Sequence, residues 1–293
     1  MASEPEKSFT ILSCLALSPR AAAVAGEALA LGRRLGGEVV FVHAGPEDAE
    51  QSAAVEAVLR EASGPGAPAP RFFVRDAAPE DAAAEVAEEV DADLVVAGAL
   101  EREGLMEGFF GSIARRIARR VPRSVLLLPA PVTGGRPFRT VVVSVAFDDA
   151  SRAMVAFAAP FARRAGATEL HFIYETDSYD RLAGRVRASE GPDPAEEAGL
   201  LRAAHLVELR HFIEDLDLSG IEVEVEVLEG AEGLESVDYA RRVGADLLVY
   251  PAPSRPLRFW DRFLKHPTEV VLERLPCAVL VHRGPGAPEV SPR

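Results

Sequence analysis

A glycine-rich segment that follows an apolar run is the part of the sequence best suited to hold an anion. The run "DLVVA", residues 93–97, is followed by four glycines between positions 98 and 111, and Ser112 then opens a pattern of helical period. Glycine has no Cβ, so an anion can come close to the backbone there. A helix start offers free amides, and a serine at the cap adds a hydroxyl. We therefore expect Gly98, Gly111 and Ser112 to face a phosphate or another oxyanion.

The helix after these glycines, "SIARRIARR", has an apolar stripe and a basic face. Ile113, Ile117 and Val121 recur at helical spacing and are expected to point inward. Charge runs on a helix are usually solvated, and a docking site for an acidic group is the alternative. The basic face consists of Arg115, Arg116, Arg119 and Arg120.

A second basic segment, "PSRPLRFWDRFLKHPTE", lies at residues 253–269. The sequence favours a solvated loop anchored by its aromatic residues, among them Trp260. The alternative is a basic, aromatic-flanked patch that docks an acidic partner or an anion. Its basic residues are Arg255, Arg258, Arg262, Lys265 and His266.

We expect no catalytic residue and no metal site. The sequence has no GxSxG elbow, no GxxxxGK phosphate loop and no HExxH zinc pair. Two of the six histidines, His205 and His211, share one predicted helix but lie six positions apart, on different faces. Cys14 and Cys277 lie far apart beside apolar runs, which indicates free buried thiols in a reducing compartment.

Composition narrows the class of protein. The chain has 293 residues, 48% of them hydrophobic and 27% charged, as in ordinary globular proteins of about two domains. A net charge of −14 argues against binding to nucleic acid or to anionic lipid. The first residues carry Glu4 and Glu6 before the apolar run "FTILSCLAL", unlike the positive leader of an export signal. We expect a cytoplasmic protein with no membrane span.

The sequence contains an internal repeat. Arg33-Arg34 recurs as Arg163-Arg164, 130 positions later, and the triplet Ala-Asp-Leu at 92–94 recurs at 245–247, 153 positions later. The offset grows because the second copy carries an insertion after its second strand. This insertion is expected to contain a polar loop and one long amphipathic helix near residues 195–215.

Short apolar runs alternate with helical segments in both copies, which is typical of parallel strands joined by crossover helices. We predict an α/β fold with two tandem doubly wound, Rossmann-like domains, each with a mostly parallel five-stranded sheet and helices on both faces. Domain 1 covers 1–131, a linker 132–137, domain 2 138–284 and a tail 285–293. The predicted strands are 9–16, 38–43, 70–75, 93–97 and 124–128, then 139–146, 168–174, 221–228, 246–250 and 277–282.

With the apolar strand, the long glycine loop, "GSIARRIARRVPRSVLLL" and the doubled layout, nearly the whole chain resembles the universal stress protein family. In nucleotide-binding members, the loop runs Gly, two residues, Gly, nine residues, Gly, then Ser or Thr. Gly98 takes the first of these places, and Gly111 and Ser112 take the last two. Glu101 stands where the middle glycine belongs, and its carboxylate would repel a phosphate.

The resemblance also implies an Asp after the first strand, where this chain has Ala16 in one copy and Ala146 in the other. Asp148 and Asp149 follow Ala146 and would substitute for it only in a remodelled turn. In the second copy Pro251 replaces the first glycine, and 265–266 read Lys-His instead of Gly-Ser. We therefore expect a degenerate nucleotide or anion pocket in domain 1 only.

ATP is the cofactor that the resemblance implies for this pocket. Six residues are assigned to it, at strand ends and at the helix start: Ala16, Val42, Gly98, Gly111, Ser112 and Ile113.

Our leading hypothesis is a non-catalytic stress-response protein whose second domain serves assembly or partner docking. The alternative is a true ATP-binding protein with weak ATPase or autophosphorylation activity through the Gly98–Ser112 loop. A nucleotide hydrolase of the wider superfamily is a third, remote candidate. Family members typically pair their last strands between subunits, which implies that the two domains pair with each other within one chain. A homodimer of the tandem chain and other protein partners are also expected.

Overall fold

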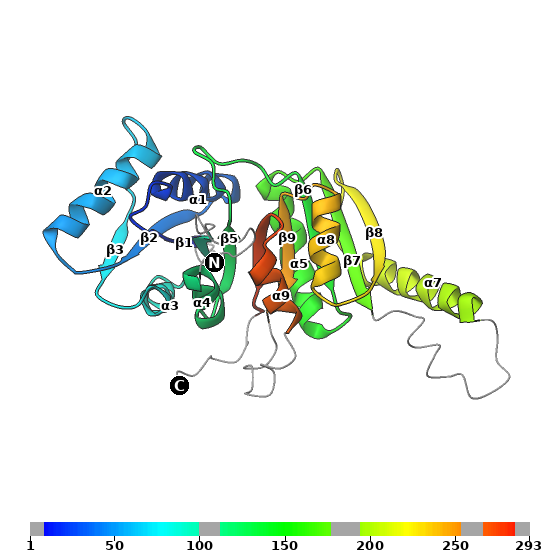
Figure 1. Cartoon of the computed structure of the whole chain (residues 1–293). Coiled ribbons are helices and arrows are strands. Elements are labelled where there is room, and N and C mark those ends of the chain that lie inside the picture. The colour runs from blue at the N-terminus through cyan, green and yellow to red at the C-terminus, as the bar shows by residue number, and fades with distance from the viewer. Residues whose placement is uncertain (1–8, 100–111, 177–193, 253–265, 285–293) are drawn as a thin grey trace, which may run out of the picture. The chain divides into compact units, whose positions relative to one another are not determined.

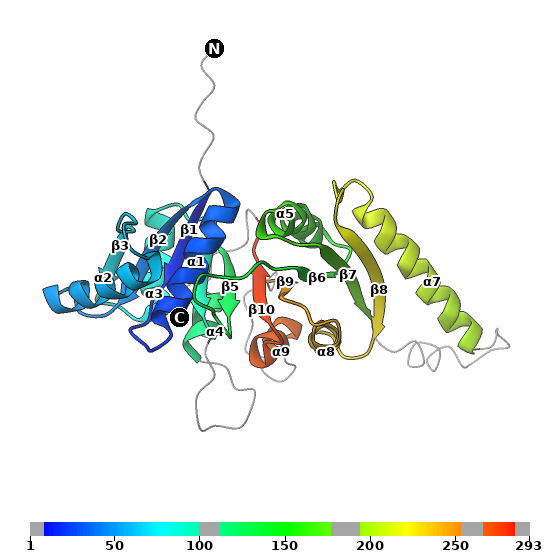
Figure 2. The same cartoon turned by 90° about the horizontal axis from the view of Figure 1, so that it is seen from above.

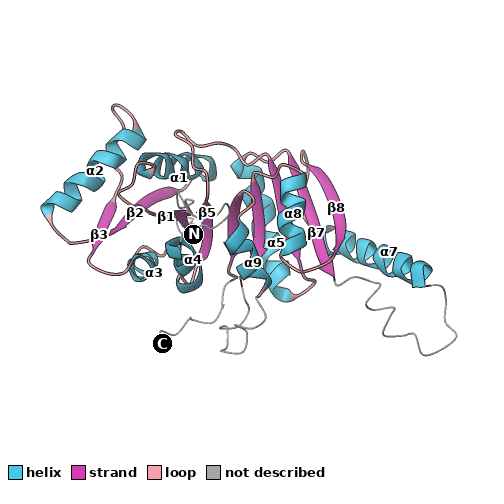
Figure 3. Cartoon of the chain, in the orientation of Figure 1, coloured by secondary structure: helices cyan, strands magenta, loops and turns pink. Residues whose placement is uncertain are grey.

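The computed structural model describes residues 9–99, 112–176, 194–252 and 266–284. Contacts divide the chain into two units, Met1–Pro137 with Leu280–Arg293, and Phe138–Val279. Both units alternate strands with helices (Figures 1 and 3). Within the described ranges, none of the helices is both long and apolar enough to cross a membrane.

The first unit contains a parallel sheet in the order β3-β2-β1-β4-β5. The strand order reverses beside β1, because β2 follows β1 on one side and β4 lies on the other. Central strands are buried on both faces, and Ile11, Leu12 and Val95 have no exposed surface. The strands are β1 (Thr10–Cys14), β2 (Glu38–Ala44), β3 (Phe72–Arg75), β4 (Leu94–Gly98) and β5 (Ser124–Leu128).

Helices cover both faces of this sheet. In the first unit α1 packs against α2, and α3 packs against α4 (Figure 1). Gly36 ends α1 in the left-handed conformation, with φ of 69°, which glycine adopts without strain. Asp48 caps α2, because its side chain accepts a hydrogen bond from the Gln51 amide at 2.8 Å. The helices are α1 (Ala21–Leu35), α2 (Ala49–Ser63), α3 (Pro79–Glu89) and α4 (Ser112–Arg120).

The second unit repeats this arrangement. β6 pairs in parallel with β7 and β9, and β7 pairs in parallel with β8. Its strands are β6 (Thr140–Val145), β7 (Glu169–Thr176), β8 (Glu222–Glu229) and β9 (Leu247–Pro251). The last strand, β10 (Ala278–His282), begins in this unit, and its residues from Leu280 onward are grouped with the first unit. Its helices are α5 (Asp149–Ala165), α7 (Pro194–Ile213), α8 (Leu234–Arg242) and α9 (Pro267–Arg274).

The predicted fold class is confirmed, and each of the ten predicted strands occurs within two residues of its expected limits. Most of these strands are short apolar runs bounded by turns, which is typical of parallel strands that are covered on both faces. The domain limits set from the sequence stay a prediction.

The repeated Ala-Asp-Leu triplet has the same structural task in both units. Asp93 Oδ2 accepts a hydrogen bond from the Thr10 amide at 2.7 Å, where β1 begins. Asp246 Oδ2 accepts from the amides of Arg139 and Thr140, at 2.8 and 3.2 Å, where β6 begins. Each aspartate therefore fixes the start of the neighbouring strand. The repeat reflects strand pairing rather than ligand binding.

The inserted helix α7 packs against β8 and β7 (Figure 2). Leu209 and Ile213 are buried against the unit, whereas Leu200 and Val207 are 65% and 64% exposed. The prediction of an amphipathic helix was therefore wrong, because apolar side chains lie on both of its faces. His205 contacts the Tyr174 ring edge to face, whereas His211 is exposed, so the two histidines lie on different faces as their six-residue spacing predicted.

Candidate functional site

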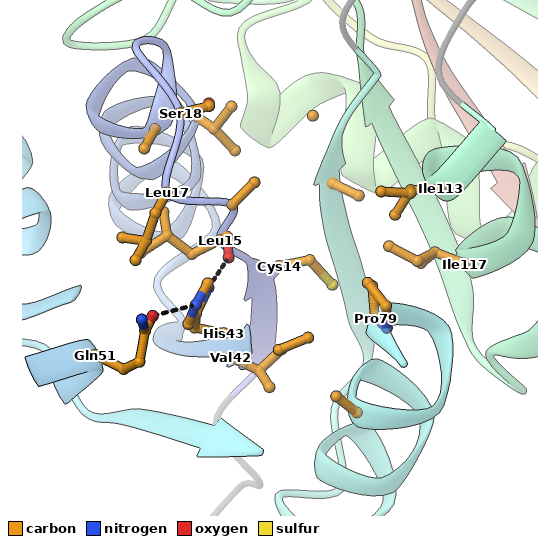
Figure 4. A pocket seen from close by; sticks show the side chains of 17 residues that line it. Cys14, Leu15, Leu17, Ser18, Val42, His43, Gln51, Pro79, Ile113 and Ile117 are labelled. Atoms are coloured by element: carbon orange, nitrogen blue, oxygen red, sulfur yellow. Dashed lines mark hydrogen bonds between the residues drawn. The ribbon is translucent and has the colours of Figure 1, made fainter. Parts of the chain in front are cut away.

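A pocket of about 480 Å³ lies in the first unit at the carboxyl ends of β1, β2 and β4 (Figure 4). It is lined by the turn after β1 and by the starts of α1, α3 and α4. The pocket therefore lies where the strand order reverses, which is the usual ligand position in open α/β sheets.

Four of the six residues assigned from the sequence line this pocket: Ala16, Val42, Gly98 and Ile113. Ser112 is the first residue of α4, and it is exposed next to Ile113. Gly111 lies outside the described residues, as do Glu101 and the rest of the glycine loop. That these residues bind a ligand stays a prediction.

The side chain of Ile113 does not point into the core, although its place in the helical stripe predicted that it would. Ile117 and Val121 are buried as predicted, at 3% and 0% exposure, but Ile113 is 47% exposed. Its side chain lies at the pocket (Figure 4), as does that of the buried Ile117, so of the three stripe residues only Val121 belongs to the core alone.

The arginines of α4 form ion pairs with the first turn of α3. Arg116 Nε lies 2.7 Å from Glu80 Oε1, and Arg120 Nε lies 3.1 Å from Asp81 Oδ1. The two acids would otherwise add negative charge at the start of α3, beside the pocket. The pairs neutralise that charge and join the two helices.

The pocket also contains a histidine that the sequence analysis did not assign to it. His43 is 8% exposed, and its Nδ1 lies 2.8 Å from the Leu15 carbonyl oxygen. Because a carbonyl only accepts, Nδ1 donates this bond. Nε2 lies 3.1 Å from the side-chain amide of Gln51 on α2. The ring is thus held from both sides, and its neighbour Gln51 lines the pocket (Figure 4).

A strand-end histidine gives no sequence signal for this role, because its two partners come from separate elements. Leu15 lies 28 positions earlier in the chain, and Gln51 lies 8 positions later, in the first turn of α2. Only their arrangement around the pocket brings the three residues together.

Cys14 lines the same pocket as a free thiol. Burial raises its pKa to about 12. The group is therefore protonated at neutral pH and is a poor nucleophile, because the thiolate is the reactive form. This agrees with the sequence-based expectation of a free, structural cysteine.

Several helix starts lie at the wall of the pocket. Neither α1 nor α3 has a side-chain cap: their N-cap residues are Arg20 and Ala78, and neither makes a capping hydrogen bond. Ala21, Pro79 and Ile113 place the first turns of three helices at the pocket wall. Helix starts carry partial positive charge. The described lining residues include no Asp, Glu, Lys or Arg, so an anionic group would meet no repulsion from them.

The second unit has large polar side chains where the first has alanines. The strand registers place Glu175 of β7 at the position of Ala44 and Tyr250 of β9 at the position of Ala97. Both alanines line the pocket of the first unit.

These two side chains are buried and bonded to each other. Glu175 is 7% exposed and Tyr250 is 5% exposed, and the Tyr250 hydroxyl donates to Glu175 Oε2 at 3.1 Å. Glu175 Oε1 accepts from the amides of Gly233 and Ser236, at 2.9 and 2.7 Å, at the start of α8. Burial raises the pKa of Glu175 above its usual value. The second unit thus fills this position with its own residues.

The turn after β6 is likewise engaged in structure. Asp148 caps α5, accepting from the Ser151 amide at 2.7 Å, so its carboxylate serves the helix. Ala146 donates its amide to Ser151 Oγ at 3.0 Å. Phe147 has φ of 53° and its ring lies 4.4 Å from that of Tyr174. Aromatic side chains therefore occupy the turn in the second unit.

Of the second basic segment, residues 253–265 lie outside the described residues, so its predicted patch is not described. His266 follows it and caps α9, accepting from the Thr268 amide at 3.3 Å. Thr268 in turn donates to the Pro251 carbonyl oxygen at 3.1 Å. In this unit the start of the last helix is thus tied to the end of β9.

Two units that share a doubly wound topology, one with an open pocket at its switch point, define a tandem α/β protein of the Rossmann-like class. The family model described as "Universal stress protein family" matches residues 44–129 and 137–283. The chain belongs to the universal stress protein family. Among curated proteins, no sequence match was found.

Two solved structures that cover nearly the whole chain show the same fold. A functionally unknown protein from Pseudomonas aeruginosa is 18% identical, with a TM-score of 0.63 over 94% of this chain and 93% of that chain. A universal stress protein from Archaeoglobus fulgidus is 15% identical, with a TM-score of 0.59 over 95% of this chain and 99% of that chain. A universal stress protein solved in complex with cAMP is 21% identical, with a TM-score of 0.38 over 51% of this chain and 99% of that chain.

Proposed function

We propose that this chain is a non-catalytic, cytoplasmic tandem stress protein that binds one small nucleotide or similar anion in its first unit. Its second unit serves assembly or partner docking. One observation carries the proposal: the position that is open beside Ala44 and Ala97 in the first unit is filled by Glu175 and Tyr250 in the second.

The shape and field of the pocket support a ligand with an apolar ring and an anionic group. Most of its wall is aliphatic, as the side chains of Leu17, Val42 and Ile117 illustrate. Such a wall suits the face of a base or another ring. The three helix starts and the hydroxyl of Ser112 suit the anion.

The described side chains support a proposal of binding without turnover. The Cys14 thiol is held protonated, and both nitrogens of His43 have partners within the protein. A general base needs a free lone pair within hydrogen-bond reach of the group that it deprotonates. His43 does not offer one in this arrangement, so we propose a binding role for the pocket.

The alternative is an ATP-binding protein with slow hydrolysis or autophosphorylation. It is favoured by the exposed position of Ser112 at the start of α4, next to the pocket residue Ile113. It requires the Gly98–Ser112 loop to hold the phosphates.

The deciding experiment is thermal unfolding with and without about 2 mM Mg-ATP, AMP, cAMP or adenosine. A ligand that binds only the native state raises the midpoint. We expect a rise with at least one of these compounds and no release of phosphate from ATP. A rise confined to Mg-ATP, lost in Ser112→Ala and accompanied by phosphate release or a phosphorylated protein, would favour the alternative. No rise with any of the compounds would overturn nucleotide binding.

A further inference from the structure

The carboxylate of Glu175 is bound by a set of donors like that of an anion-binding site, although it belongs to the chain itself. Its Oε1 accepts two backbone hydrogen bonds at the start of α8, from Gly233 and Ser236. Its Oε2 accepts the Tyr250 hydroxyl. A carboxylate at a helix start is stabilised both by these charge-assisted bonds and by the helix dipole.

The local backbone is built to keep these donors in place. Gly233 has φ of 79°, a conformation that favours glycine, and a Cβ there would lie 2.4 Å from the Pro267 carbonyl oxygen. Only glycine can therefore present its amide to Glu175 while the chain enters α8. The donor set does not depend on Glu175 itself, because two donors are backbone groups and the third is on another strand.

We propose that the second unit retains an anion-binding site, specific for a carboxylate, which the side chain of Glu175 fills from within. Glu175 is thus a tethered ligand, and Tyr250 covers its second oxygen. The first unit has Ala44 and Ala97 at the same places, so its site is left for an external ligand. The inference concerns the second unit alone and holds whichever compound the first unit binds.

Removal of the tethered group tests this. Glu175→Ala leaves three donors and a carboxylate-sized space, and we expect the unfolding midpoint to fall by roughly 5–10 °C. About 100 mM sodium acetate or formate should then raise the midpoint of E175A by roughly 3 °C or more beyond its effect on the wild type. Sodium chloride at the same concentration controls for ionic strength. No nucleotide is added, so the result does not depend on what the first unit binds.

Glu175→Gln is the matched control, because its amide fills the space and keeps one acceptor oxygen. E175Q should show no specific response to acetate. A crystal structure of E175A grown in acetate should show the anion on the amides of Gly233 and Ser236. Equal responses of E175A, E175Q and the wild type would overturn the proposal, as would a crystal structure with only water at these amides.

If E175A fails to fold in chloride, its solubility in acetate becomes the measurement. Folding in acetate but not in chloride supports the proposal. Failure in both moves the test to Glu175→Ser, which leaves a smaller space and a hydroxyl. An E175S protein that folds but shows no acetate-specific rise would overturn the proposal.

Discussion

Two pairs of side chains distinguish the two units at the residue scale. Ala44 and Ala97 leave space at the ends of β2 and β4, whereas Glu175 and Tyr250 fill the equivalent space. The difference lies in side-chain volume and in one buried carboxylate. The sheets around these residues have the same pairing pattern.

Transferring the phenol to the first unit should close its pocket. In Ala97→Tyr, the ring would enter the space that we assign to the ligand. The apparent affinity for the binding compound, measured from its midpoint rise, should therefore fall at least tenfold, roughly 1.4 kcal/mol. Ala97→Ser is the matched control and should bind nearly as the wild type does. Undiminished binding by a folded A97Y protein would place the ligand elsewhere.

His282 should make stability depend on pH. Burial lowers its pKa from 6.5 to about 4. The unfolded chain therefore takes up a proton below pH 6.5 that the folded chain refuses until about pH 4. Stability is complete above pH 6.5 and falls as the pH drops towards 4, by about 2 kcal/mol at pH 5.

Urea unfolding at pH 7.5 and pH 5 measures this effect. His282→Leu should reduce the loss of unfolding free energy between the two pH values by about 2 kcal/mol, since leucine does not titrate. Equal losses in H282L and the wild type would show that other groups account for the acid sensitivity.

At the scale of elements, aspartates set where strands and helices begin. Asp93 and Asp246 hold the first residues of β1 and β6, and Asp48 and Asp148 cap α2 and α5. The first two of these positions recur because each parallel strand leaves amides at its start that a neighbour must satisfy. Asp148, in the turn after β6, is thus committed to the backbone of α5.

Asp148→Ala should lower the free energy of unfolding by about 1 kcal/mol, because the Ser151 amide loses its acceptor. Asp149→Ala, one residue later and without the capping bond, is the control and should cost less than about 0.5 kcal/mol. Urea unfolding measures both. An equal cost for the two variants would argue against the cap.

On the scale of the whole chain, the duplication has given one unit an open pocket and the other a filled one. We therefore expect one ligand per chain. Calorimetric titration with the compound that raises the midpoint should give a stoichiometry near one, and A97Y should abolish the heat of binding. A stoichiometry of two would mean that the second unit also binds.

The expected homodimer is tested by sedimentation at micromolar concentrations. The predicted mass is that of two chains, because symmetric dimers are the commonest oligomers. A mass of one chain at all concentrations would contradict it.

Much of the fold was predictable because its signals are local. The ten strands follow from apolar runs, and the duplication follows from offsets between matching residues. The arginines of α4 were predicted as a surface feature, but their pairing with Glu80 and Asp81 was not. Ile113 was misplaced because a helical stripe does not reveal where the core ends and a pocket begins.

The sequence by itself determined the repeated α/β architecture and the family, since hydrophobic period and loop spacing act over neighbouring residues. The sequence also predicted that only the first copy keeps a pocket, whereas only the tertiary structure decided which side chains fill the equivalent place in the second copy. The contact between Glu175 and Tyr250 joins residues 75 positions apart, and His43 meets Leu15 and Gln51 from three elements. Such contacts depend on how strands pair and helices pack, because side chains that are distant in sequence meet only once the sheet has formed.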